Sequence, residues 1–426
     1  MNNLKEILSK ANRIDMFSPY FFLPFILILY FFVSLFDFHR FEQFRISESI
    51  WPAVILALVC YYIGVYIIDK LKWIIPSFGL SFWGKYVVHF VVFLTLLGLA
   101  SFLMILFSGG LGISDESNRR NLSPKLYFFS QLLWFGVLLL LSYKMILEEK
   151  MTLKKAFVYG LIFAAVMFLF LLNGYRTPLI IMLFTGIIIF HYVVKRVKLT
   201  WFLSALFIIA VAFSMFGFIR VLTEDLTIES NSREQPNVDL TIEEKAKLLT
   251  AEQKVNLTPK WIRAINQESV TGHIVLSTII EYTKEEDYLK GEIHRGIFNT
   301  VLPGEQTSPR MRVTEVVNSI GAEKGKWITR PTRTTTPTFI GQLFLDGGYL
   351  LVAIGFLLYG ALISLIYNKV KRAGIRSFHA VAYAFVITVF TVSMHTGFLD
   401  LIFILMLGFV VIASSIIKID KPKLQY

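Results

Sequence analysis

The chain has 426 residues, of which 55% are hydrophobic, 15% aromatic and only 17% charged. Soluble domains carry nearer ~25% charged residues, so this composition excludes an ordinary soluble protein and indicates a membrane protein. The single cysteine, Cys60, excludes disulfides, zinc sites and thiol redox chemistry within one chain.

Long apolar runs recur along the sequence. An apolar run of about 20 residues is the length that a helix needs to cross the hydrocarbon core of a bilayer. We therefore predict an all-α, polytopic integral membrane protein with about ten transmembrane helices. The predicted spans are 18–38, 50–68, 87–107, 126–147, 155–173, 178–194, 200–219, 345–367, 378–396 and 398–417.

Lysine and arginine are distributed unevenly between alternate loops. With the amino terminus inside, the inner segments hold 20 of the 42 Lys and Arg residues, and the short outer loops hold 6. This is the positive-inside pattern, so we expect a multi-pass protein of the cytoplasmic (inner) membrane with both termini in the cytoplasm. The net charge of +12 then reflects topology, and no nucleic-acid partner is expected.

The spans divide the chain into three parts. Residues 1–219 hold the first seven transmembrane helices, residues 220–337 form one large external loop, and residues 338–426 hold the last three helices. Loops longer than ~15 residues are usually functional or disordered. Apolar residues at helical spacing after Thr258 and Pro259 predict that this loop is partly helical. We expect two or more of its helices to lie on the membrane surface.

Two spans that run from outside to inside share one sequence device. Arg176 precedes Thr177 and Pro178 at the sixth span, and Arg330 and Arg333 precede Thr336 and Pro337 at the eighth. Threonine caps a helix, and proline suits its first turn. The free N–H groups and the dipole at such a helix end attract anions, and arginine fits phosphate well.

With Arg310 and Arg312 nearby in the sequence, this pattern predicts an external anion site. Its expected members are the helix ends at Thr177 and Thr336 and the five arginines, Arg176, Arg310, Arg312, Arg330 and Arg333. The alternative for Arg176 is that it only anchors the helix by reaching the lipid headgroups.

Three stretches resemble a known family. "GYRTPLIIMLF" (174–184), "LPGEQTSPRM" (302–311) and above all "TPTFIGQLFLDGGYLLVAIGFLLYG" (336–360) are similar to Wzy-type oligosaccharide repeat-unit polymerases. Relatives in that family include the O-antigen and enterobacterial common antigen polymerases. The span count and the large late external loop agree with this resemblance.

The resemblance implies a glycosyltransferase of polysaccharide biosynthesis that acts on the outer face of the inner membrane, for example in making lipopolysaccharide. Its substrate would be a lipid-linked oligosaccharide on a polyprenyl pyrophosphate carrier such as undecaprenyl pyrophosphate, surrounded by membrane lipids. The resemblance also implies no metal and no cofactor, and arginines that stabilise the leaving pyrophosphate. A chain-length regulator (a co-polymerase) is a candidate further partner.

A general base for the acceptor hydroxyl would add about 10²–10⁴-fold to the rate. We consider His273, Glu281 and His395 the catalytic candidates, and Glu292 and Asp346 remain further possibilities. His273 and Glu281 are eight residues apart and can share one helical face, which can equally be a solvated face. His395 lies in an outer turn, where a structural role is the alternative.

Three other functions remain open. A ligase that joins a lipid-linked glycan to another acceptor would use the same arginine chemistry. A transporter or flippase of lipid-linked sugars would carry ionisable residues inside its spans, and these are almost absent here. A scaffold for a synthase complex would tolerate removal of the arginine charges.

Overall fold

The structure is a computed structural model. It describes residues 15–35, 48–76, 84–108, 124–148, 151–172, 176–204, 260–299, 309–323, 335–374 and 376–417. Every regular element in these ranges is a helix, which confirms the all-α prediction. Seven of the described helices are long and apolar enough to cross a membrane.

The predicted spans coincide with described helices, except for the seventh, of which only the first residues, up to 204, are described. α2 and α16 are apolar but shorter than the seven long helices. The bounds are α2 (Phe22–Val33), α3 (Trp51–Leu71), α4 (Gly84–Phe107), α6 (Pro124–Leu147), α7 (Leu153–Leu172), α8 (Arg176–Ile189) with its π-helical continuation η3 (Phe190–Val194), α14 (Phe339–Ala373), α15 (Phe378–Thr396) and α16 (Leu401–Ile416).

The eighth predicted span is longer than the hydropathy pattern indicated. α14 begins at Phe339 rather than at residue 345, and it is interrupted at Gly347 and Gly348. Gly348 has φ 62° and ψ −153°, a backbone conformation that is essentially confined to glycine. The first segment of α14 therefore turns away from the long segment that crosses the bundle.

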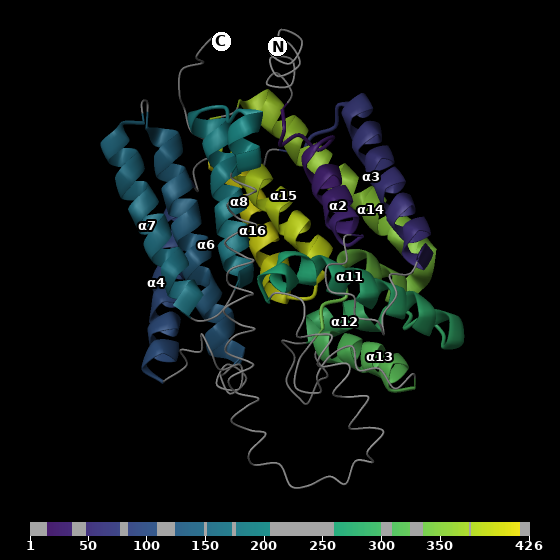
Figure 1. Ribbon diagram of the computed structural model, residues 1–426. Coiled ribbons are helices and arrows are strands. Elements are labelled where there is room, and N and C mark those ends of the chain that lie inside the picture. The colour runs from purple at the N-terminus through teal and green to yellow at the C-terminus, as the bar shows by residue number, and fades with distance from the viewer. Residues whose placement is uncertain are drawn as a thin grey trace.

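Three helices from the predicted external loop lie together at one end of the bundle, shown at the bottom in Figure 1. They are α11 (Lys260–Glu285), α12 (Glu292–Asn299) and α13 (Pro309–Glu323). α11 packs against α2, α13 and the first segment of α14 through buried residues such as Val275, Leu276 and Ile279. We call this the α11 end.

The opposite end is marked by Asp15. There Tyr20, just before α2, donates a hydrogen bond to Asp69 at the end of α3 (3.1 Å). Arg372 at the end of α14 donates to the carbonyl oxygen of Lys72 (2.7 Å). These contacts bring together segments that the charge pattern assigns to the same side. We call this the Asp15 end.

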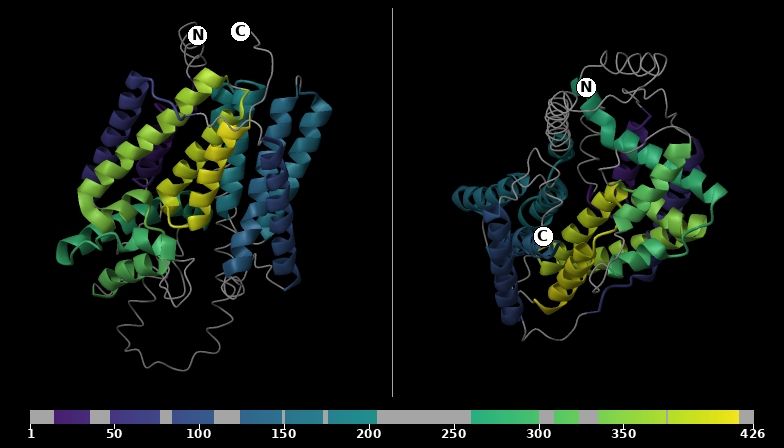
Figure 2. Two further views of the ribbon diagram at one scale, coloured as in Figure 1. Left: turned by 180° about the vertical axis from the view of Figure 1, so that it is seen from behind. Right: turned by 90° about the horizontal axis from the view of Figure 1, so that it is seen from below.

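The helices form two groups on either side of α8, α15 and α16. One group is α4, α6 and α7, and the other is α3 and α14, as Figure 1 and the left panel of Figure 2 show. α15 is the central helix, because all but three of its residues are buried and it packs against α8, α14 and α16.

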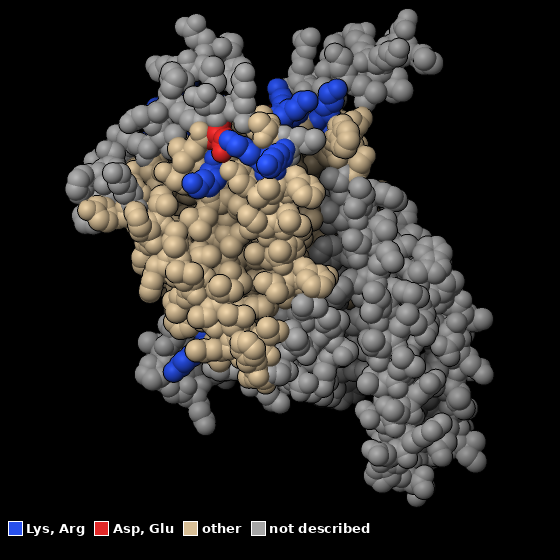
Figure 3. Space-filling model, turned by 90° about the vertical axis from the view of Figure 1, so that its left-hand side faces the viewer, with Lys and Arg blue, Asp and Glu red and all other residues tan. Residues whose placement is uncertain are grey.

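The outer surface has the character of a lipid-facing surface. In Figure 3 the described residues form a broad uncharged band, and the Lys and Arg side chains gather at its upper edge, the Asp15 end. Exposed apolar residues such as Phe157, Leu161 and Phe168 on α7 agree with this arrangement. A charge-free band between two polar edges is what a membrane-embedded bundle requires.

Candidate functional site at the α11 end

Two residues at the end of α2 form hydrogen bonds with histidines of other helices. Tyr30 Oη lies 2.9 Å from Nδ1 of His395 in the last turn of α15. Ser34 Oγ, one turn further on, lies 2.8 Å from Nδ1 of His273 on α11. These contacts join α2, α11 and α15 at the α11 end.

The predicted catalytic histidine His273 is completely buried. Its ring packs edge-on against Trp51 and lies near Phe31, with ring centroids 6.2 Å and 6.5 Å away. This burial favours a packing role for His273, and its catalytic role stays a prediction. His395 and Glu281 are both partly exposed, and their catalytic roles remain predictions.

The break in α14 and the start of α12 satisfy each other's backbone groups. Asp346, the residue before the break, accepts hydrogen bonds from the N–H groups of Ile293 (3.1 Å) and His294 (3.0 Å) in the first turn of α12. In return, the N–H of Leu289 donates to the carbonyl oxygen of Leu345 (2.9 Å). Such reciprocal capping stabilises groups that a broken helix would otherwise leave unpaired.

Asp346 also binds the ring of His294. Its Oδ2 forms a short contact with Nδ1 of His294. The Asp346 side chain is fully buried, whereas the His294 side chain is 35% exposed. The second ring nitrogen of His294, Nε2, lies 3.5 Å from the amide nitrogen of Gln342. A buried carboxylate therefore orients a partly exposed imidazole.

Gln342 connects this pair to the turn between α15 and α16. Its amide nitrogen donates to the carbonyl oxygen of Phe398 (3.2 Å), and its carbonyl oxygen accepts from the Phe398 N–H (2.6 Å). Two residues further on, Asp400 receives Arg310 from α13. The His294 pair and the Arg310 pair thus belong to one connected polar region.

Arg310 makes a forked ion pair with Asp400. Nη2 of Arg310 lies 2.6 Å from Oδ2, and Nε lies 3.4 Å from Oδ1. The Arg310 side chain remains 30% exposed. Arg312 is held by two other carboxylates, Glu292 (3.1 Å) and Glu315 (3.2 Å). Arg310 is therefore fixed beside the polar region, and Arg312 ties α13 to α12.

The other predicted anion-site residues have mixed outcomes. The cap of α14 is Thr338, whose Oγ1 accepts a hydrogen bond from the Gly341 N–H (3.0 Å), so the expectation that Thr336 caps this helix was wrong. α8 begins at Arg176, which places Thr177 in its first turn. Arg330 and Arg333 lie outside the described residues, and so does the side chain of Arg176.

Sequence reasoning did not single out His294 or Gln342. His294 lies 52 residues before its partner Asp346, on a helix of only eight residues, so no periodic pattern marks it. The available signal was Asp346 itself, a carboxylate followed by two glycines inside an apolar run.

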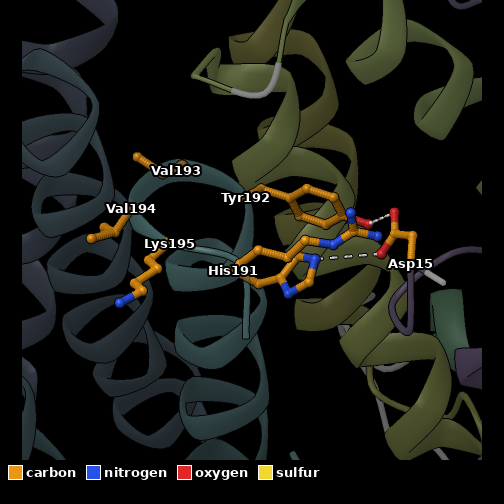
Figure 4. A pocket seen from close by; sticks show the side chains of 7 residues that line it. Asp15, His191, Tyr192, Val193, Val194 and Lys195 are labelled. Atoms are coloured by element: carbon orange, nitrogen blue, oxygen red, sulfur yellow. Dashed lines mark hydrogen bonds and ion pairs between the residues drawn. The ribbon is translucent and has the colours of Figure 1, made fainter. Parts of the chain in front are cut away.

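A second polar cluster lies at the Asp15 end, beside a cavity of about 480 Å³. The Asp15 carboxylate accepts hydrogen bonds from Tyr192 (2.8 Å) and Tyr367 (2.6 Å), and His191 lies 3.5 Å away. Figure 4 shows His191 and Tyr192 turned toward Asp15 and Lys195 turned away from it. The cluster fastens the segment before α2 to η3 and α14.

The hydrogen bonds at this cluster determine the charge of Asp15. Burial raises the pKa of the Asp15 carboxyl, but the hydrogen bonds from His191, Tyr367 and Tyr192 together lower it further than burial raises it. The pKa therefore lies below the usual value, and the carboxylate stays ionised. Among the described residues, no group of three or more His, Cys, Asp or Glu side chains is arranged to hold a metal ion.

Fold and site together define a polytopic α-helical membrane protein with an arginine-containing polar region at one end of its bundle. The model of the family described as "Putative O-antigen polymerase" matches residues 15–236 and 246–407. This match covers most of the sequence, and the chain belongs to that family, as the resemblance implied. No curated protein and no solved structure matches the chain.

Proposed function

We propose that this protein is a membrane glycosyltransferase that polymerises oligosaccharide repeat units carried on a polyprenyl pyrophosphate such as undecaprenyl pyrophosphate. In each cycle an acceptor sugar hydroxyl forms a bond to the anomeric carbon of the donor glycan. The bond from that carbon to the phosphate oxygen breaks, and its electron pair leaves with the polyprenyl pyrophosphate. The hydroxyl proton passes to a base.

The membership of the family supports polymerisation, and the fixed guanidinium of Arg310 is the observation that carries the proposed site. Negative charge develops on the pyrophosphate as the bond breaks, and a preorganised cation stabilises that charge without further reorganisation. Arg310 is held by Asp400 in a forked geometry, so its orientation is set before a substrate binds. A guanidinium offers five N–H donors, which suits bridging a carboxylate and a phosphate.

Arg176, Arg330 and Arg333 complete the proposed pyrophosphate site, together with the amino-terminal ends of α8 and α14. The free N–H groups of such helix ends favour phosphate. In this proposal, arginines and helix ends replace a divalent metal as the counter-charge. Activity should therefore persist when a chelator removes divalent cations.

The α11 end is the proposed external side of the cytoplasmic membrane. The Lys- and Arg-rich segments meet at the opposite, Asp15 end, which would then face the cytoplasm. The lipid carrier would approach along the apolar band of the bundle, and the sugars would lie beneath α11, α12 and α13. A chain-length regulator would be the additional protein partner.

The test in cells compares the surface glycans of three strains, in which the native gene is replaced by a gene for the wild-type, the Arg310→Ala or the Arg372→Gln protein. Arg372 serves as the control because it lies at the Asp15 end, where it donates to the Lys72 carbonyl oxygen. We expect long glycans with wild type and Arg372→Gln, and only single repeat units with Arg310→Ala at equal protein levels.

Two other outcomes in the Arg310→Ala strain would replace the proposal. Long glycans that stay attached to the lipid carrier would indicate that the protein is a ligase. Single lipid-linked units that accumulate inside the cell would indicate a transporter. Wild-type glycan lengths in an Arg310→Ala strain would contradict the proposed arginine site.

A further inference from the structure

We infer that His294 is the general base of the transfer and that Asp346 is its positioning residue. This inference rests on the proposed function, because it assigns the group that removes the proton from the acceptor hydroxyl. It follows from the juxtaposition of the α14 break, the start of α12 and the Gln342 side chain.

Asp346 is held in a fixed position. The carboxylate is fully buried, and it accepts two backbone N–H groups of α12 in addition to the His294 ring. Three donors hold its position, so it cannot turn away from the ring. A buried carboxylate held by this many donors keeps its orientation toward the ring.

The hydrogen bonds of His294 determine which ring nitrogen carries the proton. Since both oxygens of Asp346 already act as acceptors, the ring proton belongs on Nδ1, where it is donated to Asp346. Nε2 then carries the free lone pair, and the Gln342 amide N–H₂ lies 3.5 Å from it. Both contacts are satisfied by this one tautomer, and it leaves Nε2 able to accept a proton.

The ring of His294 is partly accessible to a substrate. The His294 side chain is 35% exposed, in contrast to the completely buried His273. The contact of Gln342 with Nε2 is long, so an acceptor hydroxyl can displace it at a small cost. Gln342 is itself buried and also hydrogen-bonds the backbone of Phe398. A substrate hydroxyl therefore takes the position in front of Nε2 when the Gln342 amide moves aside.

The surroundings of His294 contain charges of both signs. They come from its own helix and from the two helices packed against it, α13 and α14. The charged residues of these helices near His294 in the chain or at the start of α13 are Glu292 and Arg295 of α12, Arg310 and Arg312 of α13, and Asp346 of α14, of which Asp346 contacts the ring. Gly296, two residues after His294, lies close to Pro309 at the start of α13, which brings His294 and Arg310 onto neighbouring turns of packed helices.

This placement gives a balanced reaction step. Nε2 of His294 accepts the proton of the acceptor hydroxyl while the oxygen bonds to the anomeric carbon. The electron pair of the old bond leaves with the pyrophosphate, whose charge Arg310 stabilises. The imidazolium, stabilised by Asp346, returns the proton to solvent before the next cycle.

The alternative is that the pair serves only to cap α12. The variant that separates the two roles is His294→Asn, because the asparagine amide nitrogen occupies nearly the place of Nδ1 and can still donate to Asp346. It lacks Nε2, so it keeps the structural contact and loses the base. His379→Asn is the matched control. His379 is also hydrogen-bonded, to Ser414 (3.1 Å), but it lies in the first turn of α15, at the opposite end of that helix from the candidate site.

The experiment measures elongation rates of purified wild type, His294→Asn, His294→Ala and His379→Asn with the lipid-linked repeat unit in liposomes. We expect His294→Asn to lower kcat by about 10²–10⁴-fold, with KM and the melting temperature close to wild type. Added imidazole should partly restore the rate of His294→Ala, because the partly exposed site admits a small base.

Each contrary result is informative. A kcat for His294→Asn within about threefold of wild type would overturn the inference. So would a loss of rate that only accompanies a lower melting temperature, without rescue by imidazole. If the wild type itself fails to elongate an authentic substrate, the proposed function fails, and the role of His294 in this reaction fails with it.

Discussion

Arg310 and Asp400 face each other across the junction of α13 and α16, with Nη2 of the arginine 2.6 Å from Oδ2 of the aspartate. The pair lies next to the turn that Gln342 holds through Phe398. It therefore couples the helices at the α11 end to the membrane-embedded bundle, and it presents a fixed cation where the proposed pyrophosphate binds.

Variants of this pair should separate charge from geometry. Arg310→Ala should lower kcat by about 10²–10³-fold, the usual cost of removing one preorganised donor at a developing anion. Arg310→Lys keeps the charge but loses the fork, so we expect an intermediate loss. Asp400→Asn should have the mildest effect. Steady-state elongation rates of the three purified variants check this order, and a fully active Arg310→Ala would contradict it.

The cap of α14 predicts a difference between two threonines. Thr338→Ala removes the acceptor of the Gly341 N–H and should cost about 1 kcal/mol of stability. Thr336→Ala leaves this cap intact and should change stability by less than about 0.5 kcal/mol. Thermal unfolding in detergent measures both. Equal losses would mean that Thr338 does not act as the cap.

The break in α14 should not tolerate a side chain. A Cβ at residue 348 would lie 2.7 Å from the ring end of Tyr288, and the positive φ of 62° strains any other residue. Gly348→Ala should therefore cost about 1–3 kcal/mol and lower activity, because Asp346 lies next to the break. Gly408→Ala on α16 is the control, since its Cβ meets open space. A stable and active Gly348→Ala would show that the break is not required.

The crossing of α3 and α14 depends on two glycines. A Cβ on Gly64 would lie 2.1 Å from the Leu357 carbonyl oxygen, and one on Gly360 would lie 2.1 Å from the Tyr61 carbonyl oxygen. Small residues allow such close backbone approach in membrane bundles. Gly64→Ala or Gly360→Ala should each cost about 1–3 kcal/mol through overpacking.

The control for the crossing is Gly160→Ala on α7, where the added methyl group has open space. Melting temperatures of the three variants in the same detergent test the prediction. A Gly360→Ala protein as stable as Gly160→Ala would contradict the close crossing.

The Asp15 cluster predicts a pH dependence of stability. The pKa of Asp15 is lowered in the folded protein, so its ionised form contributes stability above the unfolded-state pKa of about 4. That contribution is lost as the pH falls through the lowered folded-state pKa. The stability advantage of wild type over Asp15→Asn should thus be constant near neutral pH and shrink below about pH 4. Melting temperatures across this range check it, and an advantage that grows in acid would contradict it.

The membrane helices could be predicted from the sequence because the bilayer imposes their length and apolar character. The runs around Trp51–Leu71 and Phe378–Thr396 needed no knowledge of their neighbours. The cap of α14 was misplaced because four threonines, at 334, 335, 336 and 338, surround one proline, and each is a plausible cap by residue type. Only the backbone geometry selects Thr338.

The candidate site was predictable only in part. Arg310 was singled out because arginine is the residue that suits phosphate, and that role stays a prediction. Its ion-pair partner Asp400 is 90 residues away, so the pattern could not pair the two. His294 was missed because its role depends on the break in α14 and on a carboxylate from another helix. Conversely, His273 looked suitable by residue type, and only the structure reveals its complete burial, which favours a packing role.

The most direct test of the proposed polymerase uses purified wild-type protein in liposomes with its lipid-linked repeat unit and a metal chelator. Glycan length is read on a gel, and released polyprenyl pyrophosphate is counted in the lipid extract. The proposal predicts a ladder spaced by one repeat unit, with one carrier released for each bond formed. Transfer of the glycan only to a foreign acceptor, or passage of the unchanged substrate across the bilayer without any ladder, would contradict it.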